Sequence, residues 1–287
     1  MLVTLKDMMG IAEKEGIAIG GFNTPNLASL EAVIGAAEEE KLPVILMFAE
    51  CHDEWVSLDL IGPAMLKAAK QATVPVCVHL DHGEHLEYLK KALELGFTGI
   101  MYDGSVLPYE ENVANTKKAV EMAREHGASV EAELGSMGRR ESGANDRSGD
   151  CDETKIYTDP DLASEFVSAT GIDLLACSFG TTHGIYLKEP KLDLGIVRGV
   201  RKATNDMPVV MHGGSGVSRD DYHAVIQAGV RKINYFTYMD KAGGSGAKKY
   251  LDGLAPDAPQ FYSSVFLAAR DEMKENVRHA IRMFALK

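Results

Sequence analysis

The alternation of short apolar runs with longer amphipathic segments constrains the fold of this chain more than any other feature. The runs that read as β-strands are 18–23, 44–49, 74–80, 99–102, 129–133, 173–178, 208–211 and 230–234. Helical spacing of apolar residues marks the segments 27–40, 57–71, 84–95, 109–126, 161–170, 193–204 and 218–227. This alternation predicts an α/β fold, a (β/α)8 TIM barrel. An open, doubly wound sheet is the alternative, although it needs no closure and usually has fewer repeats.

The length of 287 residues, 45% of them hydrophobic, suffices for a large core, so we expect one barrel domain over residues 1–287. Two segments break the rhythm of strands and helices. Residues 134–158 are polar and rich in Gly, Ser and Asp, which is typical of a mobile active-site loop. Residues 259–287, beyond an AGGSG stretch at 242–246, predict an extra C-terminal helix that covers the barrel or packs on a partner subunit.

The balance of charge argues against two classes of partner. Lys and Arg number 30 against 42 Asp and Glu, a net charge of -12, which disfavours nucleic acid and anionic membranes. The first residues lack a basic stretch followed by an apolar core, and no apolar run reaches the roughly 20 residues that span a bilayer. The four cysteines show no CxxC pair or disulfide-like spacing. We therefore expect a soluble cytoplasmic protein with free thiols.

Residues that carry chemistry gather where the predicted strands end, and in a barrel of this kind those ends form the active site. The motifs, in chain order, are HLDHG (79–83), YDGS (102–105), EAELG (131–135), GTTHG (180–184), HGGSG (212–216) and INYFT (233–237). Three of them supply a histidine: His82, His183 and His212. Three imidazoles at three strand ends match a catalytic zinc ion that keeps a position open for substrate. Asp103 and Glu133 are expected beside them, as their hydrogen-bond partners or as alternative metal ligands.

The remaining histidines have less specific interpretations. His79 lies within its strand and is expected in the core or next to the metal ligands. His52 is ambiguous, whereas those in helical segments are expected to be surface or satisfied core residues: His85, His126, His223 and His279.

Glycines next to two of the metal histidines indicate an anion pocket. Gly184, Gly213 and Ser215 can bring backbone N–H groups close to a phosphate, and Ser215 leads toward a helix N-terminus. Phosphate sites of TIM barrels recur near the seventh and eighth strands, so the position fits a substrate phosphate.

In this order the six motifs resemble those of class II fructose- and tagatose-bisphosphate aldolases. The resemblance covers nearly the whole chain, including GFNTPN at 21–26 and EPKLD at 189–193. It implies a TIM barrel that cleaves a ketose 1-phosphate into dihydroxyacetone phosphate and an aldehyde, with one zinc ion per subunit. It also implies a homodimer or a homotetramer.

By this resemblance, Asp81 matches the carboxylate that handles the proton of the C4 hydroxyl, and Glu141 matches a loop glutamate that exchanges the proton of the carbanion carbon. The residues that match substrate binders are Asn23, Gly184, Gly213, Ser215, Asn234 and Thr237. Backbone groups near Gly184 and Gly213 are further implied to hold a monovalent cation, Na⁺ or K⁺.

The chemistry is consistent with a metal route. Cleaving a carbon–carbon bond next to a carbonyl leaves a carbanion, which zinc stabilises as an enediolate. A lysine Schiff base is the competing route and needs a lysine at a strand end. Residues 172–178 contain none, Lys232 lies within its strand and Lys188 lies in a loop, so the sequence favours zinc.

Three positions depart from the bisphosphate pattern of the family. Ala49 stands where a serine contacts the distal phosphate, Phe236 where Asp, Asn or Ala is common, and Asp240 where an arginine is expected. An anion there would repel a second phosphate. We therefore hypothesise that the aldehyde half carries no phosphate and that Phe236 packs against it. Lys188, Arg139 or Arg140 could instead supply the missing cation, which would leave a conventional fructose- or tagatose-1,6-bisphosphate aldolase.

Two other classes of function compete with the aldolase. A non-catalytic sugar-phosphate binder would need neither Asp81 nor Glu141, and an isomerase or epimerase would need no aldehyde pocket. The sequence leaves the stereochemistry at C4 open, so both fructose-like and tagatose-like substrates remain.

Overall fold

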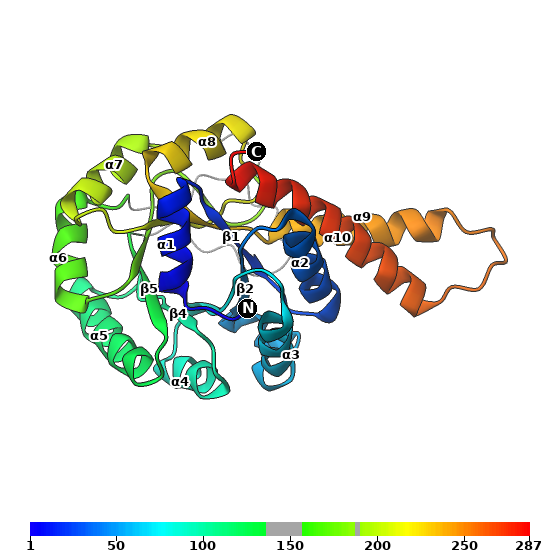
Figure 1. Cartoon of the computed structure of the whole chain (residues 1–287), viewed down its shortest axis with the longest axis horizontal. Coiled ribbons are helices and arrows are strands. Elements are labelled where there is room, and N and C mark those ends of the chain that lie inside the picture. The colour runs from blue at the N-terminus through cyan, green and yellow to red at the C-terminus, as the bar shows by residue number, and fades with distance from the viewer. Residues whose placement is uncertain (136–156, 187–189) are drawn as a thin grey trace.

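The strands of the chain close into one parallel barrel in a computed structural model that describes residues 1–135, 157–186 and 190–287. Each strand pairs with its sequence neighbours, and β1 pairs with β8 to complete the ring (Figure 1). The strands are β1 (Ile19–Asn23), β2 (Val44–Ala49), β3 (Val76–Gly83), β4 (Gly99–Tyr102), β5 (Ser129–Leu134), β6 (Leu174–Cys177), β7 (Val209–Met211) and β8 (Val230–Asn234). The predicted TIM barrel is confirmed.

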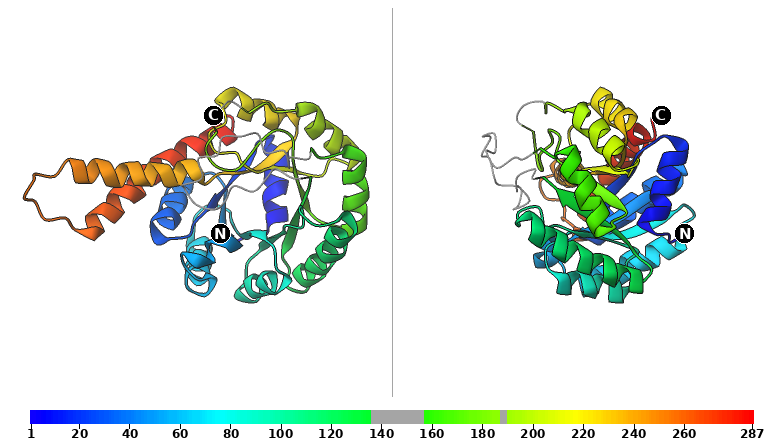
Figure 2. Two further views of the ribbon diagram at one scale, coloured as in Figure 1. Left: turned by 180° about the vertical axis from the view of Figure 1, so that it is seen from behind. Right: turned by 90° about the vertical axis from the view of Figure 1, so that its left-hand side faces the viewer.

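Helices surround this barrel (Figures 1 and 2). Most of them begin and end within two residues of the predicted bounds. The predicted ones are α2 (Leu27–Glu40), α3 (Leu58–Gln71), α4 (Leu86–Leu95), α5 (Tyr109–Glu125), α6 (Pro160–Thr170), α7 (Leu194–Ala203), α8 (Arg219–Ala228) and α10 (Tyr262–Phe284). Two helices were not predicted, α1 (Leu5–Glu15) and α9 (Thr237–Asp252), and a 3-10 turn, η1 (Glu50–Glu54), follows β2. The expected C-terminal helix is therefore present as α10.

Helix α1 packs against the barrel interior. Thr4 caps its first turn by accepting the N–H of Asp7, and Gly16 ends it in a left-handed conformation at φ 66°. Its buried side chains, Leu5 and Met8 among them, join an inner apolar cluster with residues that point into the barrel, such as Ile45. A larger apolar layer lies between the strands and the outer helices.

Helices α9 and α10 pack against each other and extend away from the barrel as a paired arm (Figures 1 and 2). The AGGSG stretch lies inside α9 and does not interrupt the helix. Its glycines let α10 approach closely. A Cβ atom at Gly243 would lie 2.2 Å from Cε of Met273, and one at Gly246 would lie 2.5 Å from the carbonyl oxygen of Ala268. Gly243 and Gly246 are therefore helix-packing residues.

Strand β3 continues to Gly83, three residues beyond the predicted range, and so contains the whole HLDHG motif. The C-terminal end of this strand is irregular: the register with β4 shifts between Leu80 and Gly83, and His82 has a φ of 42°. The predicted loop 134–158 begins later than expected because Leu134 ends β5, and 136–156 lie outside the described residues. No helix in the described ranges combines the length and the apolar character needed to cross a membrane.

Candidate active site

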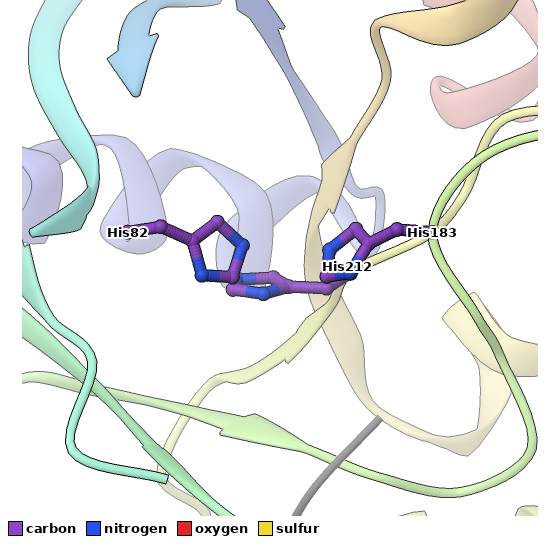
Figure 3. Close-up of side chains that lie close together, drawn as sticks. All are labelled: His82, His183 and His212. Atoms are coloured by element: carbon purple, nitrogen blue, oxygen red, sulfur yellow. The ribbon is translucent and has the colours of Figure 1, made fainter. Parts of the chain in front are cut away.

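Three histidines converge at the C-terminal end of the barrel. His82 lies at the end of β3, His212 directly follows β7, and His183 lies in the segment after β6. Their ring centroids are 4.6 Å apart for His82 and His212, 5.0 Å for His82 and His183, and 5.8 Å for His183 and His212. One nitrogen of each ring lies within 4.8 Å of the others, and the rings face a common space (Figure 3). This spacing suits a single metal ion.

Carboxylates hold two of these rings in a defined orientation. Nδ1 of His82 donates to Oδ2 of Asp103 at 2.7 Å, and Nε2 of His212 donates to Oε1 of Glu131 at 2.8 Å. Because a carboxylate accepts only, each bond leaves the opposite ring nitrogen able to bind a metal. Imidazoles supported in this way are typical zinc ligands, so the residues fit the ion that the sequence predicts.

The predicted alternative ligands lie beside the same histidines. One ligand atom each of His82, Asp103 and Glu133 also lies within 4.8 Å of the others. Burial alone would raise the pKa of Asp103, but its bonds to His82 and Ser105 outweigh burial and hold that pKa well below its usual range. Burial and the nearby Asp103 raise the pKa of Glu133. The two acids therefore differ: Asp103 is an ionised partner of His82, and Glu133 binds a proton more readily.

Asp81 is buried next to His82 and is fixed by two amides. Nδ2 of Asn23, on β1, donates to its Oδ2 at 2.9 Å, and Nδ2 of Asn234, on β8, donates to its Oδ1 at 2.9 Å. Burial would raise the pKa of Asp81, but the electrostatic effects of the neighbouring His82 and Lys232 outweigh burial and hold it well below its usual range. Asp81 is therefore an ionised carboxylate in a fixed orientation.

A buried lysine connects this carboxylate to the histidine cluster. Nζ of Lys232 lies 2.9 Å from Oε2 of Glu131 and donates to Oδ1 of Asn234 at 2.7 Å. An ammonium group only donates, so it binds the oxygen of the Asn234 amide and turns the amide nitrogen toward Asp81. Through Glu131 the same lysine supports His212. From the sequence, Lys232 is only a Schiff-base candidate and Glu131 has no predicted role.

A signal for both residues was present in the sequence. Successive side chains of a strand point to opposite faces, so Lys232 shares the inward face with Asn234, and Glu131 shares it with Glu133. His79 lies within the barrel, as expected, with Nε2 3.6 Å from Oε2 of Glu131. Burial and Lys232 lower its pKa to about 3, so His79 is neutral near pH 7.

We expect Lys232→Met to lower the free energy of unfolding by about 3–5 kcal/mol, because it leaves the fully buried Glu131 without its cation. Burial would raise the pKa of Glu131, but Lys232 and His212 lower it to about 2. The contribution of the ionised Glu131 to the free energy of unfolding is therefore complete above about pH 4.5 and is lost as the pH falls toward 2. Urea unfolding at neutral pH and at acidic pH measures this difference, which should shrink in acid.

The matched control is Lys248→Met. Lys248 pairs with Asp252 on the exposed face of α9, and such a pair contributes below about 0.5 kcal/mol. Equal losses for the two variants would contradict the structural role of Lys232.

The glycines that are expected to bind an anion lie in the segments after β6 and β7. Gly213 has a φ of 61°, and a Cβ atom there would lie 2.4 Å from the carbonyl oxygen of Thr182, so only glycine fits. The hydroxyl of Tyr186 accepts the N–H of Thr182 at 3.0 Å and donates to the carbonyl oxygen of Gly213 at 2.7 Å. These bonds tie the two segments together. Gly184, in the segment after β6, has a φ of 93°.

The end of β8 is bonded to the segment after β7. The N–H of Phe236 donates to Oγ of the buried Ser215 at 3.1 Å, and Thr237 begins α9. Asp240 lies in the first turn of α9, where desolvation raises its pKa. Ala49 ends β2 and pairs in register with Asp81. Four other predicted residues lie outside the described part of the chain: Glu141, Lys188, Arg139 and Arg140.

Comparisons with known proteins give this geometry a family context. The family profile described as "Fructose-bisphosphate aldolase class-II" matches residues 3–287. The chain is 40% identical over 287 residues to a probable fructose-bisphosphate aldolase of Bacillus subtilis (strain 168), covering 99% of this chain and 97% of that protein. It is 38% identical to the fructose-bisphosphate aldolase of Staphylococcus aureus (strain Mu50 / ATCC 700699), with the same coverage. The crystal structure of the YdjI aldolase from Escherichia coli K12 superposes with a TM-score of 0.86 at 35% identity, covering 99% and 97% of the two chains.

Proposed function

This chain belongs to the class II fructose-bisphosphate aldolase family and is therefore a carbon–carbon lyase, and from that premise we propose which substrate it cleaves and how. The proposed reaction is the reversible, zinc-dependent cleavage of a ketose 1-phosphate to dihydroxyacetone phosphate and an aldehyde without a phosphate. The observation that carries the proposal is the convergence of His82, His183 and His212 beside the clamped carboxylate of Asp81.

The three histidines would hold zinc, and Asp103 and Glu131 would keep two of them in the orientation that binds it. A bound zinc ion supplies a Lewis acid that stabilises negative charge on the oxygen of the substrate carbonyl. Lys232, through Glu131, keeps this ligand set rigid.

Asp81 would accept the proton of the C4 hydroxyl as the carbon–carbon bond breaks. Asn23 and Asn234 occupy one oxygen each, which fixes the direction in which the carboxylate meets the substrate. From the family resemblance we assign the proton exchange at the carbanion carbon to Glu141, which lies outside the described residues.

The phosphate of the dihydroxyacetone half would lie between Gly184, Gly213 and Ser215, near the start of α9 at Thr237. Backbone N–H groups at a helix start suit an anion even in a chain of negative net charge. The monovalent cation near Gly184 and Gly213 remains an implication of the resemblance, as do the homodimer or homotetramer.

Two residues at the positions where the family binds a second phosphate favour an aldehyde without phosphate. Ala49 offers only a methyl group next to Asp81, and the carboxylate of Asp240 adds negative charge at the β8 end. In the described ranges no lysine or arginine forms an ion pair with Asp240. A conventional bisphosphate aldolase would need its cation from Arg139, Arg140 or Lys188.

We expect kcat/KM for fructose 1-phosphate to exceed that for fructose 1,6-bisphosphate by about tenfold or more, which corresponds to about 1.4 kcal/mol of discrimination. Triose release by the zinc-loaded enzyme, with and without a chelator, measures this ratio. Release that survives chelation would exclude the metal route, and no release would favour a binding protein or an isomerase.

The doubly substituted variant Ala49→Ser, Asp240→Arg tests the cause of this preference. It should raise activity on the bisphosphate relative to the monophosphate, because it restores a hydroxyl and a cation. Efficient cleavage of the bisphosphate by the unmodified chain would refute the missing-phosphate hypothesis.

A further inference from the structure

Three aromatic rings form a cluster, here called the aromatic shelf, from His52, Trp55 and Phe236. The rings of His52 and Trp55 stack at 4.4 Å between centroids and 16° between planes. Phe236 lies 5.1 Å from His52 and 6.3 Å from Trp55. His52 is buried, whereas Trp55 keeps 56% of its surface exposed. A stacked tryptophan that remains half exposed offers an apolar surface to a ligand.

The shelf is built from the segments that follow β2 and β8. His52 and Trp55 come three and six residues after Ala49, whose Cα pairs with that of Asp81 in the register of β2 and β3. Phe236 follows Asn234, which donates to Asp81. Since β1 lies between β2 and β8 in the barrel, the shelf brackets the end of β1.

Groups with other expected roles lie around the rest of the C-terminal end of the barrel. The ends of β6 and β7 form the anion pocket around Gly213, and those of β4 and β5 present the carboxylates of Asp103 and Glu133. Among the described residues this leaves the β8–β1–β2 side, next to Asp81, for the substrate atoms beyond C4. The shelf lies on that side.

We propose that the aromatic shelf is the aldehyde subsite and that it binds the C–H face of an uncharged, polyhydroxylated aldehyde. The inference rests on the proposed function. Carbon-bound hydrogens of such a chain pack on ring faces, while its hydroxyl groups remain free to bind water or acceptors. Asp240, whose N–H donates to the carbonyl oxygen of Phe236 at 3.0 Å, places a carboxylate in the same region, which repels an anionic aldehyde.

Trp55 is the only tryptophan of the chain, so its fluorescence reports on the shelf directly and without turnover. Zinc-loaded enzyme titrated with erythritol, an unreactive polyol, should show a saturable change in emission. Erythritol 4-phosphate should produce a weaker change at equal concentration. An equal or stronger response to the phosphorylated polyol, or no response to erythritol, would overturn the proposal.

Kinetics of condensation test the same subsite with variants. With dihydroxyacetone phosphate as co-substrate, Trp55→Ala and Phe236→Ala should each raise KM for D-erythrose by about tenfold, which corresponds to the ~1.4 kcal/mol expected for a lost aromatic contact. KM for dihydroxyacetone phosphate should stay within about twofold, because the anion pocket is untouched. Trp55→Phe should recover most of the loss.

The matched control is Tyr262→Ala, which removes a ring that is 82% exposed at the start of α10. It should leave both KM values unchanged. If the shelf variants behave like this control while condensation proceeds, the shelf is not the subsite and the proposed function stands. If no aldehyde condenses, the proposed function fails, and the erythritol titration still decides whether the shelf binds a polyol.

Discussion

Replacing His183 with alanine is expected to remove zinc and to lower kcat/KM by at least about 10⁴-fold. Three protein ligands are the usual set for a catalytic zinc ion, and two imidazoles hold it far more weakly than three. His183 is the least buried member of the trio, so its loss leaves the barrel core intact. Metal content after dialysis and triose release from fructose 1-phosphate measure the two effects.

The control for this prediction is His279→Ala, because that imidazole is exposed on α10 and, within the described ranges, bonds to Glu275 of the same helix. It should keep both zinc and activity. If the His183→Ala protein keeps stoichiometric zinc and normal cleavage, the metal does not lie among these three rings. Unfolding curves of the two variants should agree once both proteins are stripped of metal.

Asp81→Asn is expected to lower kcat by about 10²- to 10⁴-fold while zinc remains bound, which is the usual contribution of a general acid–base group. An asparagine side chain cannot accept the C4 proton. It also offers one acceptor oxygen where Asn23 and Asn234 present two amide donors, so its own NH2 group must face one of them. Single-turnover cleavage and metal analysis separate lost chemistry from lost zinc.

Asp59→Asn serves as the control, since that carboxylate pairs with Lys91 on the exposed face of α3. It should cleave substrate at the normal rate. A proton acceptor other than Asp81 would be indicated if Asp81→Asn retained more than about a tenth of kcat with zinc in place.

The barrel could be predicted because most of its strands contain a short apolar run and its helices are amphipathic, so the alternation of the two is visible in the sequence. Helix α9 was missed because Gly243 and Gly246 usually indicate a loop, and their contacts with α10 depend on tertiary packing. Helix α1 was missed because no strand precedes it. Strand β3 extends past its prediction because polar side chains at its end face a polar interior.

In the candidate site, the ligand types were visible at the strand ends, and the structure brings His82, His183 and His212 together there. What the sequence did not reveal is which buried groups link them. Lys232 and Glu131 lie far apart in the chain, and their pairing depends on the closure of the barrel. Sequence spacing alone does not encode that kind of contact. The aromatic shelf was missed for the same reason, since Phe236 comes from β8 and His52 from the turn after β2.

The buried pair of Lys232 and Glu131 and the half-exposed aromatic shelf should differ in how readily their residues change during evolution. Substitutions at Lys232 or Glu131 would strand a charge in the interior, so selection should reject them in almost any background. Trp55 lies on a short surface turn, where exchange costs little folding energy. New aldehyde preferences can therefore evolve, or be engineered, through a few rim side chains while the inherited bond-breaking chemistry persists.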